Sequence, residues 1–331
     1  MPYHRPTALL ALTLALLGVL NLGIAGPATA DPVTVEATPI PLHPGDANVV
    51  AAGKLRYRGG LQLQSADRHF GGFSALGLSA DGARMVALSD EGRRLAANLV
   101  YDAAGNLKGL AQTELDTLAD LDGRPLSQNV DADAESMSPG VDGEIIVAFE
   151  RNHRLWRYLP GEVAPRPLKS PDELSKLPAN NGIEALTLLA DGRLLAISEG
   201  SGKNKNAIGW VSDPQGWSVL TYTLKGGFRA TGAATLPDGD VMLLERRYTL
   251  RSGVAARVRR VAGKDVMPGA ALEGALIGEL RPPVNVDNME GIETIRPAAG
   301  PNAGKTLVYL ISDDNFNPLQ RTLLMMFELT E

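Results

Sequence analysis

Five stretches of the chain share one pattern of apolar and polar positions: an apolar run, a short turn and a second apolar run. The clearest copy spans residues 180–200, NNGIEALTLLADGRLLAISEG, with an Asp-Gly step between the runs. Asp-Gly favours a tight turn, because glycine tolerates the positive φ that such turns require. Each stretch therefore predicts a β-hairpin.

The other copies lie at residues 71–92, 133–151, 229–247 and 288–315, and the last has a longer connection in place of Asp-Gly. The Asp-Gly steps begin at Asp81, Asp142, Asp191 and Asp238. The runs are apolar on both faces, which indicates strands covered on both sides. More polar strand candidates lie between the copies. Four strands per repeat with buried inner strands is typical of a propeller blade.

We therefore predict an all-β protein, a β-propeller of five blades, with a sixth, degenerate blade as the alternative count. The last repeat ends in RTLLMMFEL (321–329) and is one strand short, while residues 53–65 form an orphan strand candidate ahead of the first copy. Pairing the two would close the ring and remove an exposed sheet edge. The alternative architecture is a sandwich of unrelated hairpins.

The start of the chain has a different character. Residues 1–30 contain the apolar run TALLALTLALLGVL and end in Ala28-Thr29-Ala30, which predicts a secretory signal peptide. The alternative is a membrane anchor, which needs about 20 apolar residues. Residues 31–50, with four prolines, are expected to form an extended leader, and residues 51–331 one propeller domain. A periplasmic or secreted location follows from this interpretation.

Composition narrows the function classes. Hydrophobic residues make up 44% and charged residues 21%, which suits a globular core, and the net charge of -6 argues against nucleic acid as a partner. There is no cysteine, so thiolate catalysis and thiolate metal sites are excluded. We expect a monomer that acts on a small molecule, with no membrane contact after signal cleavage.

The hairpins bring acidic residues together. In a hairpin the first strand starts and the second strand ends at the same edge, and the inner hairpins of a propeller share one mouth of the central channel. The pairs predicted at that mouth are Glu184 with Glu199, Glu135 with Glu150, Glu293 with Asp313 or Asp314, Ser74 with Asp90, and Thr231 with Glu245. The Asp-Gly turns should lie at the opposite face.

Such a ring of carboxylates needs compensation, because like charges repel and raise carboxylate pKa values. Hard cations such as Ca²⁺ take six to eight oxygen ligands, and an acidic site without cysteine favours Ca²⁺ or Mg²⁺ over zinc. Arg151, Arg246 and Arg247 directly follow acidic strand ends and could interleave with the carboxylates. The alternative is that these glutamates are simply solvated.

Five short stretches occur in a fixed order along residues 50–331: FGGFSALGLSADG, NNGIEALTLLADGRLLAISEG, LLERRY, NMEGIE and ISDDNFNP. As a set they resemble the bacterial exported phytase-like family called "esterase-like activity of phytase". The resemblance implies a β-propeller and a calcium-dependent phosphoester or ester hydrolase. By position, the family's acidic residues correspond to Asp90, Glu184, Glu199, Glu245, Glu290, Glu293 and Asp313. The second copy departs from the pattern at DAESMS, so Glu135 is left out of this set.

The leading hypothesis is a metal-dependent hydrolase of phosphoesters or simple esters. Carboxylates would hold Ca²⁺, one glutamate would act as base, and Arg151 or Arg246 would stabilise the leaving oxyanion. The first candidates for the glutamates are Glu184, Glu199 and Glu293. The alternatives are a non-catalytic periplasmic propeller that binds a ligand or protein partner, and a lactonase-type propeller.

Overall fold

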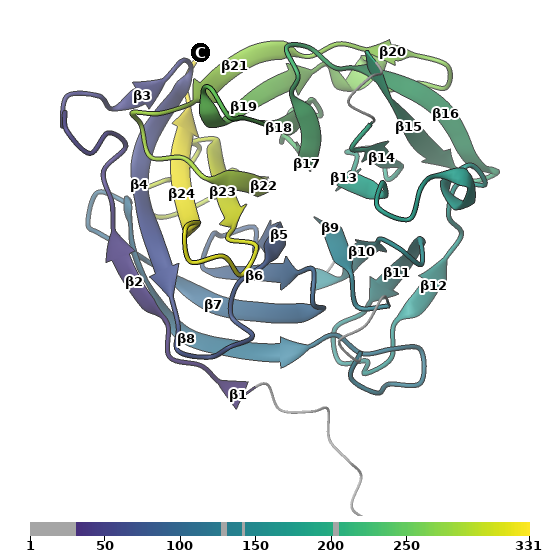
Figure 1. Ribbon diagram of the computed structural model, residues 1–331, viewed down its shortest axis with the longest axis horizontal. Helices are drawn as coiled ribbons and strands as arrows, with labels where there is room; N and C mark the ends of the chain where they lie inside the picture. The colour runs from purple at the N-terminus through teal and green to yellow at the C-terminus, as the bar shows by residue number, and fades with distance from the viewer. Residues whose placement is uncertain (1–30, 127–130, 141–142, 201–204) are drawn as a thin grey trace, which may run out of the picture.

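The computed structural model describes residues 31–126, 131–140, 143–200 and 205–331. Five small antiparallel sheets stand around a central axis, so the protein is a five-bladed β-propeller (Figure 1). The predicted fold class and the count of five blades are confirmed. The signal-peptide prediction for residues 1–30 and the turn at Asp142 lie outside the described residues.

Each blade begins with an inner strand and ends with an outer one. Blade 1 contains β5 (Phe73–Leu78), β6 (Arg84–Ser89), β7 (Arg93–Tyr101) and β8 (Leu107–Thr117). Blade 2 contains β9 (Ala134–Pro139), β10 (Ile145–Phe149), β11 (Arg154–Tyr158) and β12 (Arg166–Leu168). Blade 3 contains β13 (Ile183–Leu188), β14 (Leu194–Ser198), β15 (Asn206–Asp213) and β16 (Gly216–Thr223), with β20 (Ala271–Leu272) added at its edge.

Blade 4 contains β17 (Arg229–Thr235), β18 (Val241–Thr249), β19 (Gly253–Val261) and β21 (Ala275–Leu280). Blade 5 contains β22 (Asn288–Ile295), β23 (Leu307–Asp313) and β24 (Thr322–Leu329), followed by β4 (Leu55–Gln64) from the start of the chain. Two short 3-10 helices, η2 (Leu174–Lys176) and η3 (Gly263–Asp265), lie in connections. No helix among the described residues is long and apolar enough to span a membrane.

The ring closes where the two ends of the chain meet. β4 pairs antiparallel with β24 from Thr322 opposite Leu63 to Leu329 opposite Leu55, which confirms the predicted closure. The leader continues across this seam: β2 (Glu36–Pro39) pairs with β4 of blade 5, and β1 (Asp31–Pro32) pairs with β8 of blade 1. The short strand β3 (Ala51–Ala52) also pairs with β4. The leader therefore connects the outer edges of the first and last blades.

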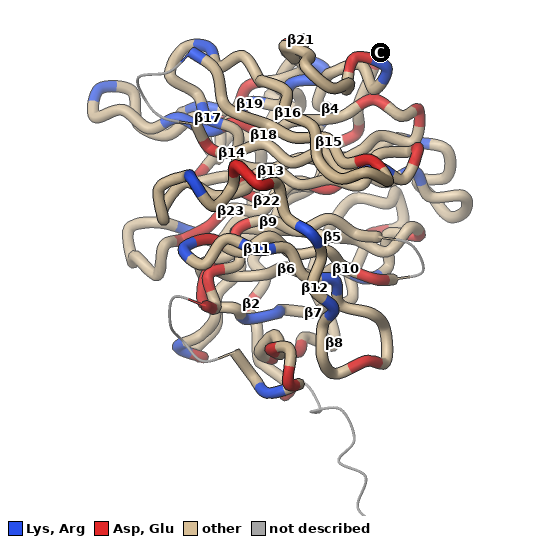
Figure 2. The backbone as a smooth tube through the Cα atoms, turned by 90° about the vertical axis from the view of Figure 1, so that its right-hand side faces the viewer, with Lys and Arg blue, Asp and Glu red and all other residues tan. Residues whose placement is uncertain are grey.

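Apolar side chains fill the space between neighbouring blades. Blades 1 and 5 share one core cluster, which includes Leu76, Met85, Tyr309 and Leu324, and similar clusters lie at the other blade interfaces. Burial on both faces explains why the inner strands read as continuous apolar runs. In the side view of Figure 2, acidic and basic positions are interspersed over the outer surface.

The inner strands form the wall of the central channel. Each of them contacts the inner strands of both neighbouring blades, in the order β5, β9, β13, β17, β22 and back to β5. The glycines of the turns at Asp81, Asp191 and Asp238 have φ between 71° and 90°, as the tight-turn prediction requires. These turns close the inner hairpins at the end away from the residues described next.

Candidate functional site

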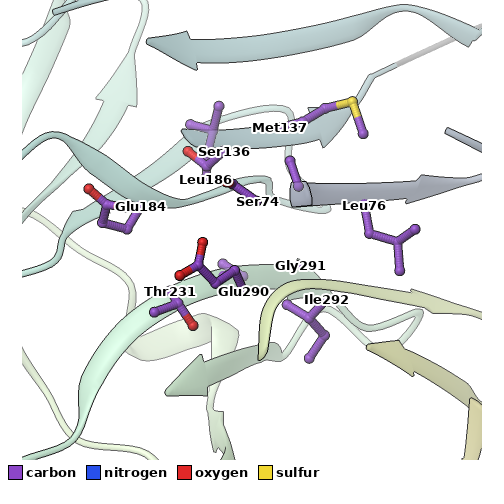
Figure 3. A pocket seen from close by; sticks show the side chains of 13 residues that line it. Ser74, Leu76, Ser136, Met137, Glu184, Leu186, Thr231, Glu290, Gly291 and Ile292 are labelled. Atoms are coloured by element: carbon purple, nitrogen blue, oxygen red, sulfur yellow. The ribbon is translucent and has the colours of Figure 1, made fainter. Parts of the chain in front are cut away.

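A β-bulge recurs at the same place in all five inner strands. The pairing register skips one residue between the first and second strands of each inner hairpin. The skipped residues are Ser74, Glu135, Glu184, Thr231 and Glu290, and we call them the bulge ring. A bulge re-aims its side chain, and here four of the five line the central cavity, with Glu135 interacting with the carboxylates of Glu184 and Glu290. Figure 3 shows Glu184 and Glu290 projecting from two inner strands.

A second ring lies at the ends of the neighbouring strands. The residue that pairs just before the bulge is Ser89 in β6, Phe149 in β10, Ser198 in β14, Glu245 in β18 and Ser312 in β23. The residue after each of these forms the rim ring, which consists of Asp90, Glu150, Glu199, Arg246 and Asp313. Four rim positions are acidic and the fourth blade contributes the arginine.

An apolar ring lies beyond the bulge ring. Two residues after each bulge come Leu76, Met137, Leu186, Ala233 and Ile292, and all five line the same narrow cavity, whose volume of about 10 Å³ has room for about one water molecule. Small residues between the two rings allow the strands to approach closely. A Cβ on Gly232 would come 2.6 Å from the carbonyl oxygen of Glu290. The cavity therefore has an acidic entrance and an apolar floor.

The glutamates of the bulge ring are strongly perturbed. Burial raises the pKa of Glu184 well above its usual range, and the charges of Glu150, Glu199 and Glu290 raise it further. Burial likewise raises the pKa of Glu135, again with help from Glu184 and Glu290. Each of these carboxyl groups therefore resists ionisation until positive charge is supplied.

The same effect extends to blades 5 and 1. Burial raises the pKa of Glu290 to about 8, although the nearby Arg246 opposes the shift. Burial also raises the pKa of Asp90 to about 7 and that of Asp313 to about 6, and the neighbouring carboxylates contribute to both shifts. The mouth is thus short of positive charge.

The donor set fits a hard cation. Asp133, Glu135 and Glu150 each offer an oxygen within 4.8 Å of the others. Asp90 Oδ1 is buried and has no hydrogen-bond partner among the described residues. Carboxylate oxygens at this density suit Ca²⁺, which takes oxygen ligands only.

The arginines at the mouth are already engaged. Arg246 lies 3.1 Å from Glu290 and 3.8 Å from Glu199, measured between side-chain nitrogen and oxygen atoms. Arg229 donates to Glu199 at 2.8 Å, and Arg151 forms an ion pair with Asp133. These arginines therefore neutralise particular carboxylates, and other carboxylates of the mouth are left without compensating positive charge.

Most of the residues singled out by sequence do come together. The structure places Asp90, Glu184, Glu199, Glu290, Asp313 and Arg246 at one end of the channel, in the bulge and rim rings. Arg151 follows the rim residue Glu150, and its side chain is 56% exposed beside Asp133.

The structure does not bring Glu245 into this group. Glu245 occupies the position before the rim, which holds buried serine or phenylalanine in the other blades, and it is completely buried. It accepts a hydrogen bond of 2.7 Å from the Tyr222 hydroxyl and pairs with Arg257. The predicted pairing of Thr231 with Glu245 was one residue out of register, and Arg246 takes the rim position instead.

Glu293 also lies apart from the mouth. It pairs with Tyr309 in the interior of the hairpin, whereas Asn288 pairs with Asp313 at the open end. Its carboxylate accepts a 2.7 Å hydrogen bond from the Thr294 N–H. Burial raises its pKa to about 8, with no contribution from the mouth carboxylates. Matching the Gly-Ile-Glu letters of copies three and five misled the sequence comparison, because the bulge in β22 falls at Glu290.

The sequence analysis paired Glu135 with Glu150 at the mouth but left Glu135 out of the family's acidic set. A usable signal was present: Ser74, Glu135, Glu184 and Thr231 each lie seven residues before the aspartate of their Asp-Gly step, at 81, 142, 191 and 238. Asp133, which completes the close acidic group with Glu150, follows no such repeat. Only the folded register places it at the mouth.

The fold and the mouth together define a propeller with a carboxylate-lined channel. The family model described as "Phytase-like: Esterase-like activity of phytase" matches residues 68–316, and the chain belongs to this family. No curated protein matches the chain.

Several solved structures match the chain at low sequence identity. A gluconolactonase from Xanthomonas campestris (XC5397) is 12% identical, with 92% of this chain and 99% of that chain covered and a TM-score of 0.41. The PQQ-bound aldose sugar dehydrogenase from Streptomyces coelicolor is 11% identical, with 90% and 100% covered and a TM-score of 0.42. A protein of unknown function from Dyadobacter fermentans is 12% identical, with 77% and 75% covered and a TM-score of 0.41. Similarity at this level assigns no activity.

Calcium is expected to stabilise the folded protein. A cation that binds only the folded state, at 100 times its dissociation constant, adds about 2.7 kcal/mol. At a scale of roughly 2–4 °C per kcal/mol, chelation should lower the Tm by several degrees and Ca²⁺ should restore it. The double variant Glu135→Gln/Glu150→Gln removes two of the three carboxylates that lie within 4.8 Å of one another, so it should lose most of this shift and melt higher in chelator, because repulsion is relieved. Glu293→Gln is the matched control on inner strand β22, outside the mouth, and its calcium shift should persist. Equal shifts in all three proteins would place the calcium effect elsewhere.

Arg246 is expected to compete with a cation for the rim carboxylates. Arg246→Gln should raise the affinity for Ca²⁺ about tenfold, because a positive charge leaves the side of Glu199 and Glu290. Calorimetric titration with Ca²⁺ measures this. Arg193→Gln removes the same charge from the turn face, where Arg193 pairs with Asp191, and should leave the affinity unchanged. An affinity that falls in Arg246→Gln would contradict the competition.

Proposed function

We propose that this protein is a calcium-dependent hydrolase of a phosphoester or simple ester, acting in the channel mouth. The observation that carries the proposal is the convergence of Glu135, Glu184 and Glu290 on equivalent bulges, beside the close group of Asp133, Glu135 and Glu150. The family description, which names esterase-like activity, supports the same class of reaction.

The residues divide into a cation-holding group and a reacting group. Asp133, Glu135 and Glu150 would hold Ca²⁺, with Asp90 and Asp313 as further oxygen donors on the rim. When bound, Ca²⁺ would supply positive charge that offsets the carboxylates and polarises the ester.

Glu184 is the proposed general base. It lines the cavity, and its raised pKa makes its ionised form a stronger proton acceptor than an ordinary carboxylate. Glu184 takes a proton from water, the water oxygen bonds to the acyl carbon or phosphorus, and the bond to the leaving oxygen breaks. The proton then passes to that oxygen. Glu199 holds Arg246, and Arg246 or Arg151 would face the leaving oxygen as negative charge develops.

We also propose that the protein works outside the cytoplasm. The apolar segment in residues 1–30 and the cleavage pattern ending at Ala30 support export. Fractionation of cells that express the full chain, with mass spectrometry of the mature N-terminus, would test this.

A non-catalytic binding module is the competing function. The engagement of Arg246 with two carboxylates favours it, since a pre-paired arginine has less to offer a reacting oxygen. Phosphomonoesters, carboxylic esters, lactones and phytate should be assayed with Ca²⁺ and with chelator. The proposal expects calcium-dependent turnover of at least one substrate above the Glu184→Gln background. Turnover that never exceeds this background would favour the binding module.

A further inference from the structure

The narrow cavity between the inner strands has the size of one water molecule. Its volume of about 10 Å³ is about the least that holds a water. Glu184 and Glu290 line it from the bulge ring, and Leu186 and Ile292 line it from the apolar ring (Figure 3). Among the described residues, the five of the rim ring take no part in this lining. The cavity therefore lies inside the channel, beneath the rim.

A water in this cavity meets hydrogen-bond acceptors. The hydroxyls of Thr231 and Ser136 each donate to a backbone carbonyl of a neighbouring strand, so their lone pairs remain for the water. The carboxylates of Glu184 and Glu290, when ionised, also only accept. Asn288 Nδ2 donates to Glu290 Oε1 at 2.8 Å and holds that carboxylate in place. Such surroundings take up both hydrogens of a water and leave a lone pair on its oxygen free.

The apolar ring limits the size of what can enter. Leu186 and Ile292 are buried in the packing between blades, each in a different core cluster. Protein interiors are close-packed, so side chains of this kind yield little space. Methanol exceeds water by one methyl group, and that group would have to displace a packed side chain. The cavity therefore discriminates between water and an alcohol by size.

We propose that this cavity binds the attacking water and that the apolar ring selects water against alcohols. The inference rests on the proposed hydrolase function and deepens it by assigning the site of the second reactant. Glu184 accepts one hydrogen of the water and takes it as a proton when the water oxygen bonds to the acyl carbon or phosphorus in the mouth. Glu290 or Thr231 accepts the other hydrogen. The leaving oxygen departs with the bonding electron pair and then receives the proton from Glu184.

The first test measures the partition between hydrolysis and transfer to methanol. The Ca²⁺-loaded protein is given p-nitrophenyl acetate or p-nitrophenyl phosphate in water that contains methanol, and NMR compares the methyl product with acetate or phosphate. In the transfer, the methanol oxygen bonds to carbon or phosphorus, Glu184 takes its proton and p-nitrophenolate leaves. Above the Glu184→Gln background, wild type should prefer water over an equal concentration of methanol by about 10–200-fold, the range for one methylene group.

Variants of the apolar ring test the origin of this preference. Leu186→Ala widens the cavity and should raise the share of methyl product about tenfold or more. Leu194→Ala removes the same atoms from the same core cluster, away from the cavity lining, and should keep the wild-type share. Ile292→Val is a milder change in the ring, with a smaller cost in stability, and should raise the share in the same direction. Equal shares in all four proteins would overturn the inference and leave the hydrolase proposal intact.

Crystal structures test the water site without turnover. Crystals of the protein grown in Ca²⁺ and soaked in methanol should show a single water peak within about 2.5–3.0 Å of carboxylate oxygens of Glu184 and Glu290. The Leu186→Ala crystals should show methanol at this place. A dry cavity, methanol in the wild-type cavity, or an anomalous peak there after Mn²⁺ replacement would overturn the inference. A retained water peak in a protein that turns over neither substrate would overturn the hydrolase proposal and leave the water site standing.

Discussion

Glu184→Gln is expected to lower kcat/KM for the best ester substrate by about 10²–10⁴-fold, the range that a positioned general base contributes. Glutamine keeps the size and the hydrogen-bonding atoms of the side chain but cannot accept a proton from water. The fold should not suffer, since Glu184 is held by no ion pair among the described contacts and is surrounded by other carboxylates. Steady-state kinetics in saturating Ca²⁺, together with the Tm of the variant, measures both effects.

The control for this variant lies in the same channel wall. Glu293→Gln makes the same chemical change on inner strand β22, outside the mouth, and should retain wild-type kcat/KM. A Glu184→Gln variant with full activity would remove Glu184 from the mechanism. Loss of activity in both variants would show that the channel wall, rather than one carboxylate, is being perturbed.

Glu293→Gln itself is expected to stabilise the protein at pH 8 by roughly 4 kcal/mol, since one pKa unit corresponds to about 1.4 kcal/mol. The pKa of Glu293 is raised by burial from its usual value of 4.5 to about 8. The folded state therefore holds a proton that the unfolded state releases between these pH values. The stability that protonated Glu293 contributes is fully present below about pH 4.5. It is lost as the pH rises through 8, because ionisation favours the unfolded chain.

Urea unfolding in chelator at pH 5, 6.5 and 8 tests this linkage. Wild type should lose stability across the series, and Glu293→Gln should lose less, with the gap widest at pH 8. Asp90 and Glu290 contribute to the wild-type slope in the same direction, since burial raises their pKa values to about 7 and about 8. Ca²⁺ should suppress the part of this pH dependence that comes from Asp90 and Glu290, and leave the part that comes from Glu293. A gap between the two proteins that is constant with pH would contradict the raised pKa.

The repeated hairpins made the fold predictable from sequence. Asp-Gly steps at fixed distances from apolar runs define the inner strands, and the one missing strand in the last repeat pointed to closure by residues 53–65. These signals are local, because turn chemistry and apolar burial act within a few residues.

The site was predicted less completely, because it depends on register. A shift of one residue turns a side chain to the other face of a strand. That shift separates Glu245, buried against Tyr222, from Arg246 at the rim. In copy five no Asp-Gly step fixes the count, so Glu293 was ranked above Glu290. The bulges that aim these side chains into the channel are a property of the pairing register, which the order of apolar and polar residues does not determine.

The central claim is that the channel mouth holds a divalent cation on its carboxylates. A crystal structure of the protein grown in millimolar Ca²⁺, with anomalous diffraction after Mn²⁺ replacement, tests it most directly. The account predicts a cation peak bounded by oxygens of Asp133, Glu135 and Glu150, which already lie within 4.8 Å of one another. A mouth without a cation peak under these conditions, or a peak only at the turn face, would contradict it.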